Sequence, residues 1–508
     1  MKRLIANGAS LLGLNPESAK EHETQHEGLG VFTKFAQAEC QRACDNELEL
    51  LRNRVMAKSP SIDRSKLPPG PHFAALQSFG YMRDPYGYMK RMRARYGDTF
   101  TMPTMNGLLV LANTTEGARE VLKGGEKDFG VGFGVDVLSH LLGENSLLLI
   151  SGHAHQRERK ILSPVFHGNR MKAYAPAMRQ AALEQSASWR TGESVVMQSE
   201  MQSISLDVII RAVLGVTEPT RISIFRDAIR HAVSEISPWP LFLAPLRHEF
   251  LGMGPWARFL RSKRIFDELL YEEIVRARSQ PQSREDILSR LVESADEEGN
   301  TLTDGAIRDH LVTLLVAGHE TTSSALAWAF EEIGRHPAIE NWLHDELASL
   351  GPEPDPVQLA NLPALHAVAK ESLRLHPIIP EFFRTVKDGY RFMEWDLPPG
   401  VILAGSMLSI QKDPDLYPQP EKFDPNRFIE KSFSPHEFTA FGGAHRYCLG
   451  SAFALAEMAV IIGTLLPRFE LRSGRDRPLK TVRNHVTLGP EGGAVLEVRA
   501  KRIPAAQS

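Results

Sequence analysis

The sequence predicts a mainly α-helical domain with small β-sheets, an α+β architecture in which one long helix crosses the core. Three observations favour it. A helical apolar pattern runs from Asp304 to Gly334, short β-like stretches are scattered between helical segments, and no repeat or linker interrupts the chain after Pro71. At 1.5 Å per residue the long helix would measure roughly 45 Å, which is enough to cross a large core.

The composition of the chain excludes several classes of protein. With 508 residues, of which 42% are hydrophobic and 24% charged, the chain is an ordinary globular protein. Its 59 basic and 62 acidic residues give a formal charge of -3, so we expect no nucleic-acid partner. The cysteines, Cys40, Cys44 and Cys448, are too few for a disulfide framework and fit a reducing compartment.

The first residues do not predict a membrane anchor. The apolar stretch from Leu4 to Leu14 is far shorter than the roughly 20 residues that a membrane-spanning helix needs. Acidic residues follow it, which argues against a secretory signal and a mitochondrial transit peptide. We therefore expect a cytoplasmic protein without a transmembrane anchor.

Residues 1–66 are predicted to form an N-terminal helical appendage and linker, and residues 67–508 the main domain. The boundary is placed at Leu67-Pro-Pro-Gly-Pro71, where prolines stop the preceding helix. In the appendage, His22, His26, Cys40 and Cys44 could supply four zinc ligands from two helical turns. Free cysteines on an apolar helix face are more often packing residues, and that alternative stays open.

The remaining elements follow from local patterns. Short β-strands are expected in Thr99–Leu111, Arg391–Ile410 and Val486–Val498. Helices are expected to begin near Pro363 and Ala452. The polar breaks at 279–286 and 295–304 are too short to mark domain boundaries, so the main domain is predicted to be single.

The middle of the long helix contains residues that a packing helix would not select. Gly318 costs about 1 kcal/mol in a helix, and Glu320 is costly to bury. Leu314, Gly318 and Thr321 share one face, so the missing side chain at Gly318 is expected to leave space for a small molecule beside the Thr321 hydroxyl. A kink or a hydrogen-bonded core carboxylate is the structural alternative.

Cys448 lies in the loop Phe441–Gly450, after a glycine-rich stretch and before an apolar helix. Backbone N–H groups at a helix start would stabilise a thiolate and favour a metal ligand, whereas a lone cysteine is by default a small buried hydrophobe. Zinc is disfavoured because the nearby His445 stands alone. A single soft ligand fits a metal that another group already holds, such as a porphyrin.

Two further pairs carry charge. Glu371 and Arg374 lie three residues apart on a helix with little polar surface, which predicts a buried ion pair that needs a third partner. His155 and Arg159 lie four residues apart and can point the same way toward carboxylates of a ligand. A solvated basic face is the alternative for the second pair.

Together and in this order, these clusters resemble the cytochrome P-450 superfamily of haem-thiolate monooxygenases, of the soluble bacterial type. The resemblance covers Leu67 to Arg502. It rests on five motifs: Gly152-x-x-His155-x-x-x-Arg159, Ala317-Gly318-x-Glu320-Thr321-Thr322, Glu371-x-x-Arg374, Phe423-Asp-Pro-Asn-Arg427-Phe428 and the loop Phe441–Gly450.

The resemblance implies that the cofactor is haem b (iron protoporphyrin IX), with Cys448 as the axial thiolate. Thr321 and Glu320 would be the catalytic residues that deliver protons to dioxygen. The haem propionates and the loop around the haem would be held by His155, Arg159, Arg384, Arg446 and Phe441. A buried structural triad would consist of Glu371, Arg374 and Arg427.

The resemblance also implies a substrate pocket of mostly apolar segments, including 239–246, which favours a small lipophilic substrate. Its named residues would be Leu314, Ala317, Gly318, Ile379, Glu381 and Leu488. Glu381 is the charged exception. It could pair with a cationic nitrogen or orient a hydroxyl of the substrate, or it could face solvent.

The implied partners are O2 and a ferredoxin or flavodoxin with its reductase, which would pass on electrons from NAD(P)H. Arg157 and Lys160 could form a docking surface for such a carrier, or a solvated face. The alternatives are a peroxygenase, isomerase or dehydratase that uses the same haem, and a non-enzymatic haem sensor. Ala444 stands where the family usually has glycine, at a cost of roughly 1 kcal/mol if the backbone needs a positive φ.

Overall fold

The computed structural model describes residues 62–104, 107–132, 135–166, 170–235, 252–279, 286–296, 298–475, 477–484 and 487–501. The chain divides into two units, Met1–Ile62 and Asp63–Ser508, and the second is described here. The predicted zinc ligands of the appendage, His22, His26, Cys40 and Cys44, lie outside the described residues. Residues 237–246, part of the expected apolar pocket, lie outside them too.

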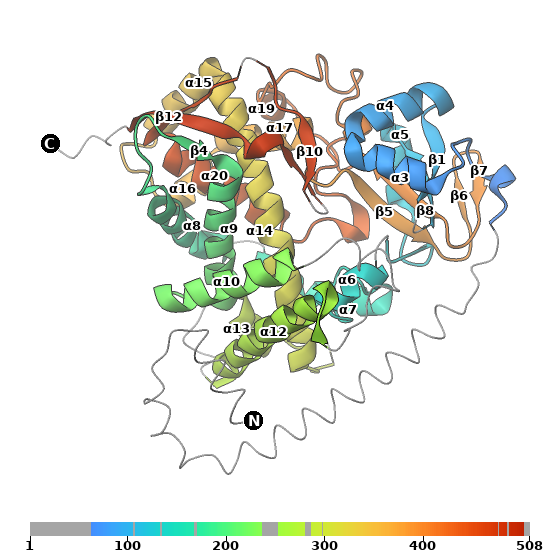
Figure 1. Cartoon of the computed structure of the whole chain (residues 1–508), viewed down its shortest axis with the longest axis horizontal. Coiled ribbons are helices and arrows are strands. Elements are labelled where there is room, and N and C mark those ends of the chain that lie inside the picture. Colours follow the sequence, from blue (N-terminus) through green and yellow to red (C-terminus); the bar gives the residue numbers. More distant parts are fainter. Residues whose placement is uncertain are drawn as a thin grey trace, which may run out of the picture. The chain divides into compact units, whose positions relative to one another are not determined.

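The second unit is mainly helical, as predicted (Figure 1). The helices are α3 (Ala74–Arg83), α4 (Pro85–Tyr96), α5 (Thr115–Lys123), α6 (Val135–Leu142), α7 (His153–Leu162), α8 (Arg170–Ser186), α9 (Met197–Leu214), α10 (Pro219–Ser234), α12 (Pro255–Ser279), α13 (Ile287–Glu293), α14 (Asp304–Arg335), α15 (Pro337–Ala348), α16 (Pro356–Ala360), α17 (Pro363–Leu375), α18 (Met407–Ile410), α19 (Arg427–Glu430) and α20 (Ser451–Leu465). None of these described helices is long and apolar enough to cross a membrane.

The strands form small sheets. The largest has the order β1-β2-β8-β5-β3, in which β2 and β8 are parallel and the other pairs antiparallel. Its strands are β1 (Thr99–Thr104), β2 (Gly107–Ala112), β3 (Phe129–Gly130), β5 (Glu381–Val386) and β8 (Ile402–Ser406). The smaller sheets contain β4 (Ser194–Val196) with β12 (Val495–Lys501) and β9 (Phe469–Ser473), β6 (Tyr390–Phe392) with β7 (Trp395–Leu397), and β10 (Thr481–Asn484) with β11 (Thr487–Pro490).

Each predicted β-stretch contains strands, but two of them also include helical residues. Val486–Val498 contains β11, part of β12 and, between them, the 3-10 turn Glu491–Gly493. Thr99–Leu111 corresponds to the hairpin β1–β2. The expected stretch Arg391–Ile410 contains β6, β7 and β8, but its last four residues form helix α18, so the prediction was wrong there. The residues of β8 and α18 are buried almost throughout, and a fully buried run has no alternation that separates strand from helix.

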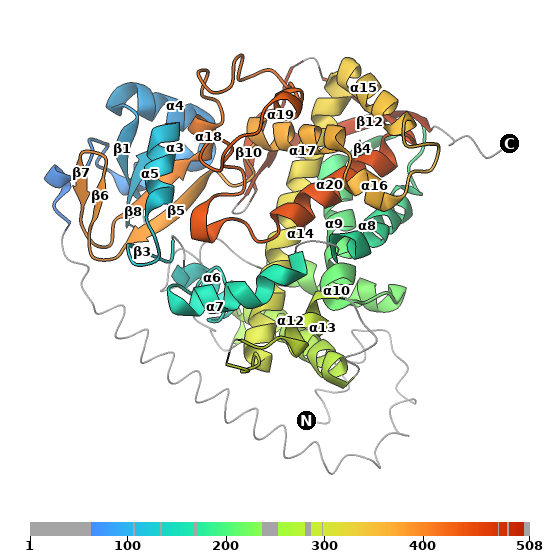
Figure 2. The same cartoon turned by 180° about the vertical axis from the view of Figure 1, so that it is seen from behind.

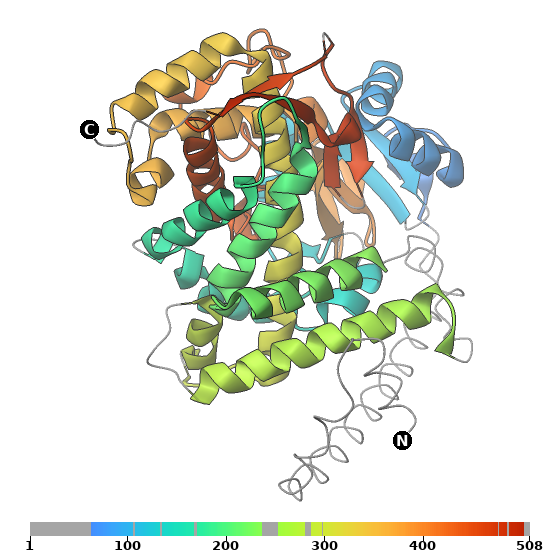
Figure 3. The ribbon, with the colours of Figure 1, turned by 60° about the vertical axis from the view of Figure 1, so that its left-hand side comes forward.

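Helix α14 is the structural axis of the unit. It begins after Thr303, whose hydroxyl accepts a hydrogen bond from the Ala306 N–H at 3.2 Å, and it ends within one residue of the predicted boundary. It packs against α9, α12, α17, α20 and β11. Figure 2, the view from behind, shows α17 and α20 beside α14. Figure 3 shows α10 and α12, in green, running across α14. The helix therefore reaches both the helical core and the β10–β11 hairpin.

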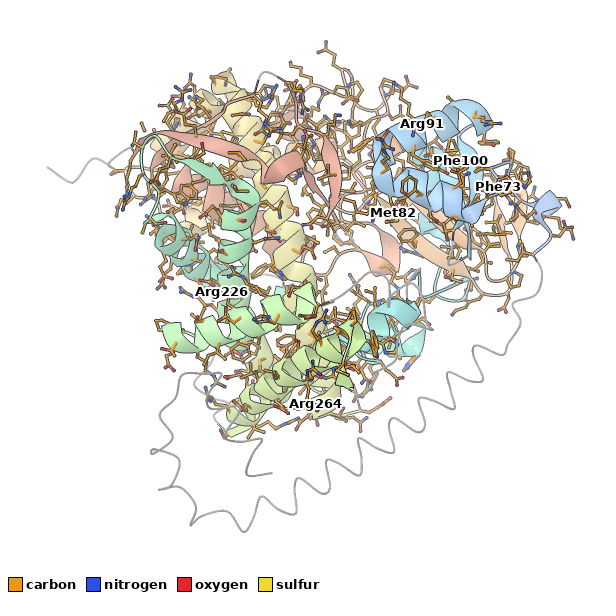
Figure 4. The ribbon with its side chains drawn as sticks, in the orientation of Figure 1. Phe73, Met82, Arg91, Phe100, Arg226 and Arg264 are labelled. Atoms are coloured by element: carbon orange, nitrogen blue, oxygen red, sulfur yellow. The ribbon has the colours of Figure 1, made fainter. Side chains whose placement is uncertain are left out.

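Two hydrophobic cores can be followed among the described residues. The larger gathers the helices around α14. The smaller lies between α3, α4 and the five-stranded sheet, and includes Tyr81, Phe100 and Leu488. Figure 4 labels Phe100 with Phe73 and Met82, which lie near the two ends of α3 and are exposed.

Candidate functional site

The loop Phe441–Gly450 places Cys448 just before α20. The Cys448 N–H donates to the carbonyl of Phe441 at 2.9 Å, and Gly442 and Ala444 both have positive φ angles, 67° and 53°. Cys448 is exposed, yet burial raises the pKa of its thiol. Exposure of a deeply placed sulfur means that it borders a hollow inside the unit. The Gly450 N–H and the Arg159 charge act in the opposite direction on this pKa and favour a thiolate.

One face of α14 also borders open space. Ala317 is exposed and Leu314, Gly318 and Thr321 are half-buried, in a helix whose other residues are mostly buried. The Thr321 hydroxyl donates to the Ala317 carbonyl at 2.7 Å, one turn earlier. Leu314, Gly318 and Thr321 are the residues that were predicted to share one face of the helix.

Gly318 serves a different purpose from the expected one. A Cβ atom at this position would lie 2.9 Å from Cδ1 of Ile209 on α9. The space left by the missing side chain is thus taken by Ile209, and the glycine allows α14 and α9 to approach closely. Ile209 therefore bounds, on the α9 side, the space that was expected beside Thr321.

Glu320 turns its carboxyl group toward the β10–β11 hairpin. Its side chain is 7% exposed, and the hydroxyl of Thr487 lies 3.2 Å from Oε1. Thr487 is 1% exposed and belongs to β11. The sequence analysis missed Thr487, because it lies 167 positions from Glu320 and no local pattern marks it.

Basic side chains converge on the loop that carries Cys448. Arg159 of α7 donates to the carbonyl of Tyr447 at 2.7 Å, and Arg384 of β5 donates to that of Gly443 at 3.0 Å. Arg446 donates to the carbonyls of Leu147 and Ile150 at 3.1 and 2.6 Å. The rings of His155 and His445 are 6.2 Å apart between centroids. Four of the predicted haem-binding residues are therefore gathered at one loop.

The charges of this cluster are unbalanced. Burial lowers the pKa of Arg384 to about 10, and the Arg446 charge adds to the shift. Burial also lowers the pKa of His445 to about 4, again with a contribution from Arg384. The Glu126 carboxylate lies 2.6 Å from Nδ1 of His155 and acts to raise the pKa of both His445 and His155. Burial outweighs it and lowers the pKa of both imidazoles. The three arginines, Arg384 buried and Arg159 and Arg446 half-buried, leave an excess of positive charge that fits a ligand with negative charge.

The donors present fit the propionates of a haem. The Nε atom of Arg384 is buried without a hydrogen-bond partner among the described residues, so it has a free donor for a carboxylate. The described part of the chain contains no group of three or more His, Cys, Asp or Glu side chains that could hold a metal ion. Cys448 therefore suits a metal whose other ligands come from a macrocycle.

Glu371 and Arg374 of α17 form a fully buried ion pair. Arg374 donates from Nε to Oε2 at 2.7 Å and from Nη2 to Oε1 at 2.9 Å, and both side chains have no exposed surface. Arg427 lies 3.4 Å from Glu371, and the Asp424 N–H donates to the same carboxylate at 2.8 Å. The two residues and their third partner are thus brought together ahead of the Cys448 loop.

The residues predicted for the substrate pocket are distributed differently. Ile379 is half-buried, while Leu488 is fully buried and packs in the smaller core. Glu381 is 5% exposed and does not face solvent. Tyr81 of α3 donates a short hydrogen bond to Glu381, and burial raises the pKa of Glu381 to about 7 against the opposing influence of Tyr81 and Arg483.

Some contributors to this region were not predicted. Tyr81 lies 300 positions from Glu381, and Glu126 lies 29 positions from His155. Arg157, expected on a basic surface, is ion-paired with Asp296 at 2.7 Å. No single-sequence signal marks such tertiary pairs, because the groups meet only after folding.

Comparisons with known proteins agree with this geometry. Residues 65–496 match the family model described as cytochrome P450. The chain is 34% identical over 447 residues to cytochrome P450 135B1 of Mycobacterium tuberculosis, a match that covers 87% of this chain and 93% of the relative. It is 33% identical over 443 residues to cytochrome P450 135A1 of the same organism, covering 86% and 96%.

A solved structure is also similar. Retinoic acid bound cyanobacterial CYP120A1 superposes with a TM-score of 0.74 at 25% sequence identity, and the match covers 85% of this chain and 99% of that one. The similarity therefore extends over nearly all of the residues that the structure describes.

Proposed function

The chain belongs to the cytochrome P450 family of monooxygenases, and from that premise we propose that it inserts one oxygen atom of O2 into a lipophilic organic substrate. The reaction would be a hydroxylation or an epoxidation. The observation that carries this proposal is Cys448, bordering a hollow and surrounded by buried cations on the loop ahead of α20. A thiolate ligand together with donors for two carboxylates would hold a haem b at this site.

When bound, the haem would supply the oxygen-activating chemistry, with Cys448 as its axial ligand. His155, Arg159, Arg384 and Arg446 would hold the propionates. The Gly450 N–H and the Arg159 charge would stabilise the thiolate form of Cys448. Glu371, Arg374 and Arg427 would hold in place the segment that leads to the Cys448 loop. Arg374 and Arg427 donate to backbone carbonyls of this segment before α19.

Thr321 and Glu320 would handle protons at the opposite side of the hollow. The hydroxyl hydrogen of Thr321 is donated to its own helix, which leaves the oxygen lone pairs free to accept a hydrogen bond from water or substrate. Glu320 is the adjacent acid that can take a proton from solvent and pass it inward.

A lipophilic substrate is supported by the apolar side chains at the hollow, which include Leu314, Ala317 and Ile379. The cyanobacterial structural neighbour is named for bound retinoic acid, an apolar polyene with one carboxylate. Glu381 would orient a polar group of the substrate. Its carboxyl group already accepts from Tyr81 and lies within the field of Arg483, which favours a neutral hydroxyl over a second cation.

Electrons would come from NAD(P)H through a reductase and a separate ferredoxin or flavodoxin. A P450 needs two electrons per oxygen atom inserted, and the family model accounts for residues 65–496. Lys160, exposed on α7, would contribute to the surface that such an acidic carrier meets.

The decisive experiment is the carbon monoxide difference spectrum of the reduced protein. We expect the strongly red-shifted band of a thiolate-ligated haem, and its loss in Cys448→Ser. An unshifted band in the wild-type protein would reject the haem-thiolate assignment. Cys448 is the one cysteine among the described residues, so the substitution is specific there.

Substrate class is tested by a type I spectral-shift screen of fatty acids, retinoic acid, terpenes, steroids and alkaloids. Compounds that shift the spectrum are then incubated with NADPH, ferredoxin and reductase. Product that depends on NADPH and O2 supports a monooxygenase. Product formed with hydrogen peroxide alone indicates a peroxygenase, product formed without any oxidant an isomerase or dehydratase, and binding without product a sensor.

A further inference from the structure

The Glu320 carboxyl group shares one hydroxyl with a backbone carbonyl of the β10–β11 hairpin. Oγ1 of Thr487 lies 3.2 Å from Oε1 of Glu320 and 2.8 Å from the carbonyl oxygen of Asn484. Glu320 and Thr487 are buried at the contact between α14 and β11, and Asn484 is half-buried. Thr487 of β11 therefore contacts the Glu320 carboxyl group although the two residues are far apart in the sequence.

A hydroxyl group has one hydrogen, so Thr487 can donate to only one of its two neighbours at a time. When Glu320 is ionised, Thr487 can donate to the carboxylate. When Glu320 is protonated, the carboxyl O–H can donate to Oγ1, and the Thr487 hydrogen turns to Asn484. The hydroxyl is thus a hydrogen-bond partner for both protonation states of the acid, without movement of any heavy atom.

Both sides of this contact are held in place. Asn484 and Thr487 face each other in the hairpin ladder, and the next N–H, of Leu488, donates to the carbonyl of Ile378 at 2.8 Å. On α14, the Ser323 hydroxyl donates to the backbone carbonyl of Glu320 at 2.9 Å. A fixed donor and a fixed helix restrict the directions available to the carboxyl group.

We propose that Thr487 is a positioning residue that holds the Glu320 carboxyl group in one place while its proton leaves and is replaced from solvent water. This inference rests on the proposed monooxygenase function. On this proposal the β10–β11 hairpin supports proton delivery through Glu320, although Thr487 itself contacts neither dioxygen nor substrate. Loss of the hydroxyl would weaken the preference of the carboxyl group for its present orientation, and a hydrogen bond to a charged group corresponds to about a tenfold bias between orientations.

The first test is spectroscopic and needs no turnover. The infrared band of the Glu320 carboxyl group is assigned in the resting protein as the band that Glu320→Gln removes. In Thr487→Val, which keeps the shape of the side chain, this band should move to higher frequency because the group loses a hydrogen-bond partner. Thr487→Ser should keep it. Thr464→Val removes another buried hydroxyl, which donates to Val460 on α20, and should leave the band unchanged.

The second test is the fate of reducing equivalents. Thr487→Val should release several-fold more hydrogen peroxide per NADPH than wild type and should change the solvent isotope effect, because proton delivery is slowed. Thr487→Ser should restore both. If Thr487→Val folds poorly, Thr487→Ala is measured in its place.

An unchanged infrared band, or unchanged peroxide release in Thr487→Val, overturns the proposal. Failure of the monooxygenase assignment itself would be recognised separately, since the carbon monoxide spectrum and NADPH-dependent product would then be absent in wild type.

Discussion

Arg374 binds Glu371 through two parallel hydrogen bonds, from Nε to Oε2 at 2.7 Å and from Nη2 to Oε1 at 2.9 Å, with neither side chain exposed. The Nη1 group of Arg374 donates to the backbone carbonyls of Gln411 and Pro420 at 2.8 Å each. The pair thus ties α17 to the chain that leads to the Cys448 loop. A buried pair of this kind is costly to break, because the surviving charge is left without a partner.

Arg374→Met should therefore lower the free energy of unfolding by about 3–5 kcal/mol. Urea denaturation of the purified protein measures the change. The control is Arg391→Met, which removes the exposed ion pair with Asp396 and should alter stability by no more than about 0.5 kcal/mol. Equal effects of the two substitutions would contradict the role assigned to burial.

Ala444 is expected to be a strained position. Its φ of 53° lies in the left-handed region, where a side chain costs about 1–2 kcal/mol and glycine costs almost nothing. After allowance for the greater freedom of glycine in the unfolded chain, Ala444→Gly should stabilise the protein by about 0.5–1 kcal/mol.

The matched control is Ala94→Gly in the exposed part of α4, which should destabilise by about 1 kcal/mol. Thermal unfolding compares the two. A loss of stability in both variants would show that the loop does not need the left-handed conformation.

Glu457 should make stability fall as the pH rises. It is 1% exposed on α20, and burial raises its pKa from 4.5 to about 8. Between these values the folded protein keeps a proton that the unfolded chain has lost, so the free energy of unfolding decreases by about 1.4 kcal/mol per pH unit from this group.

Glu457→Gln should flatten this part of the pH profile and stabilise the protein at pH 8 relative to wild type. Urea unfolding at pH 5, 6.5 and 8 gives the slope for each variant. The exposed Glu394→Gln substitution serves as the control and should leave the slope unchanged. An identical slope in wild type and Glu457→Gln would reject the assignment.

Arg384 should contribute to retention of the haem. Arg384→Met removes the buried Nε donor that lacks a partner among the described residues, and the affinity for haem should fall by about tenfold. Transfer of haem to an excess of apomyoglobin measures the dissociation rate. The control is Arg83→Met at the exposed end of α3. It removes the same positive charge and should leave the rate of haem dissociation unchanged.

Local sequence patterns were sufficient for part of this architecture. The apolar periodicity predicted α14 to within one residue, because helix limits depend on neighbouring residues such as the Thr303 cap. The spacing of Glu371 and Arg374 predicted their contact for the same reason, since groups three apart on a helix always lie close.

The remainder depended on tertiary contacts. Thr487 meets Glu320, and Tyr81 meets Glu381, only once β11 and α3 have packed against their neighbours. Local pattern also misassigned the end of the Arg391–Ile410 stretch, where burial on all sides removed the alternation of a strand.

The close approach of α9 to α14 at Gly318 has a consequence for protein engineering. Ile209 of α9 fills the position that a side chain at 318 would occupy, so this residue limits the space beside Thr321. Bulkier substrates would be accommodated by shortening Ile209, while enlarging residue 318 would force the two helices apart. The size of the proposed substrate pocket should thus depend on α9, a helix that carries none of the residues proposed to handle protons.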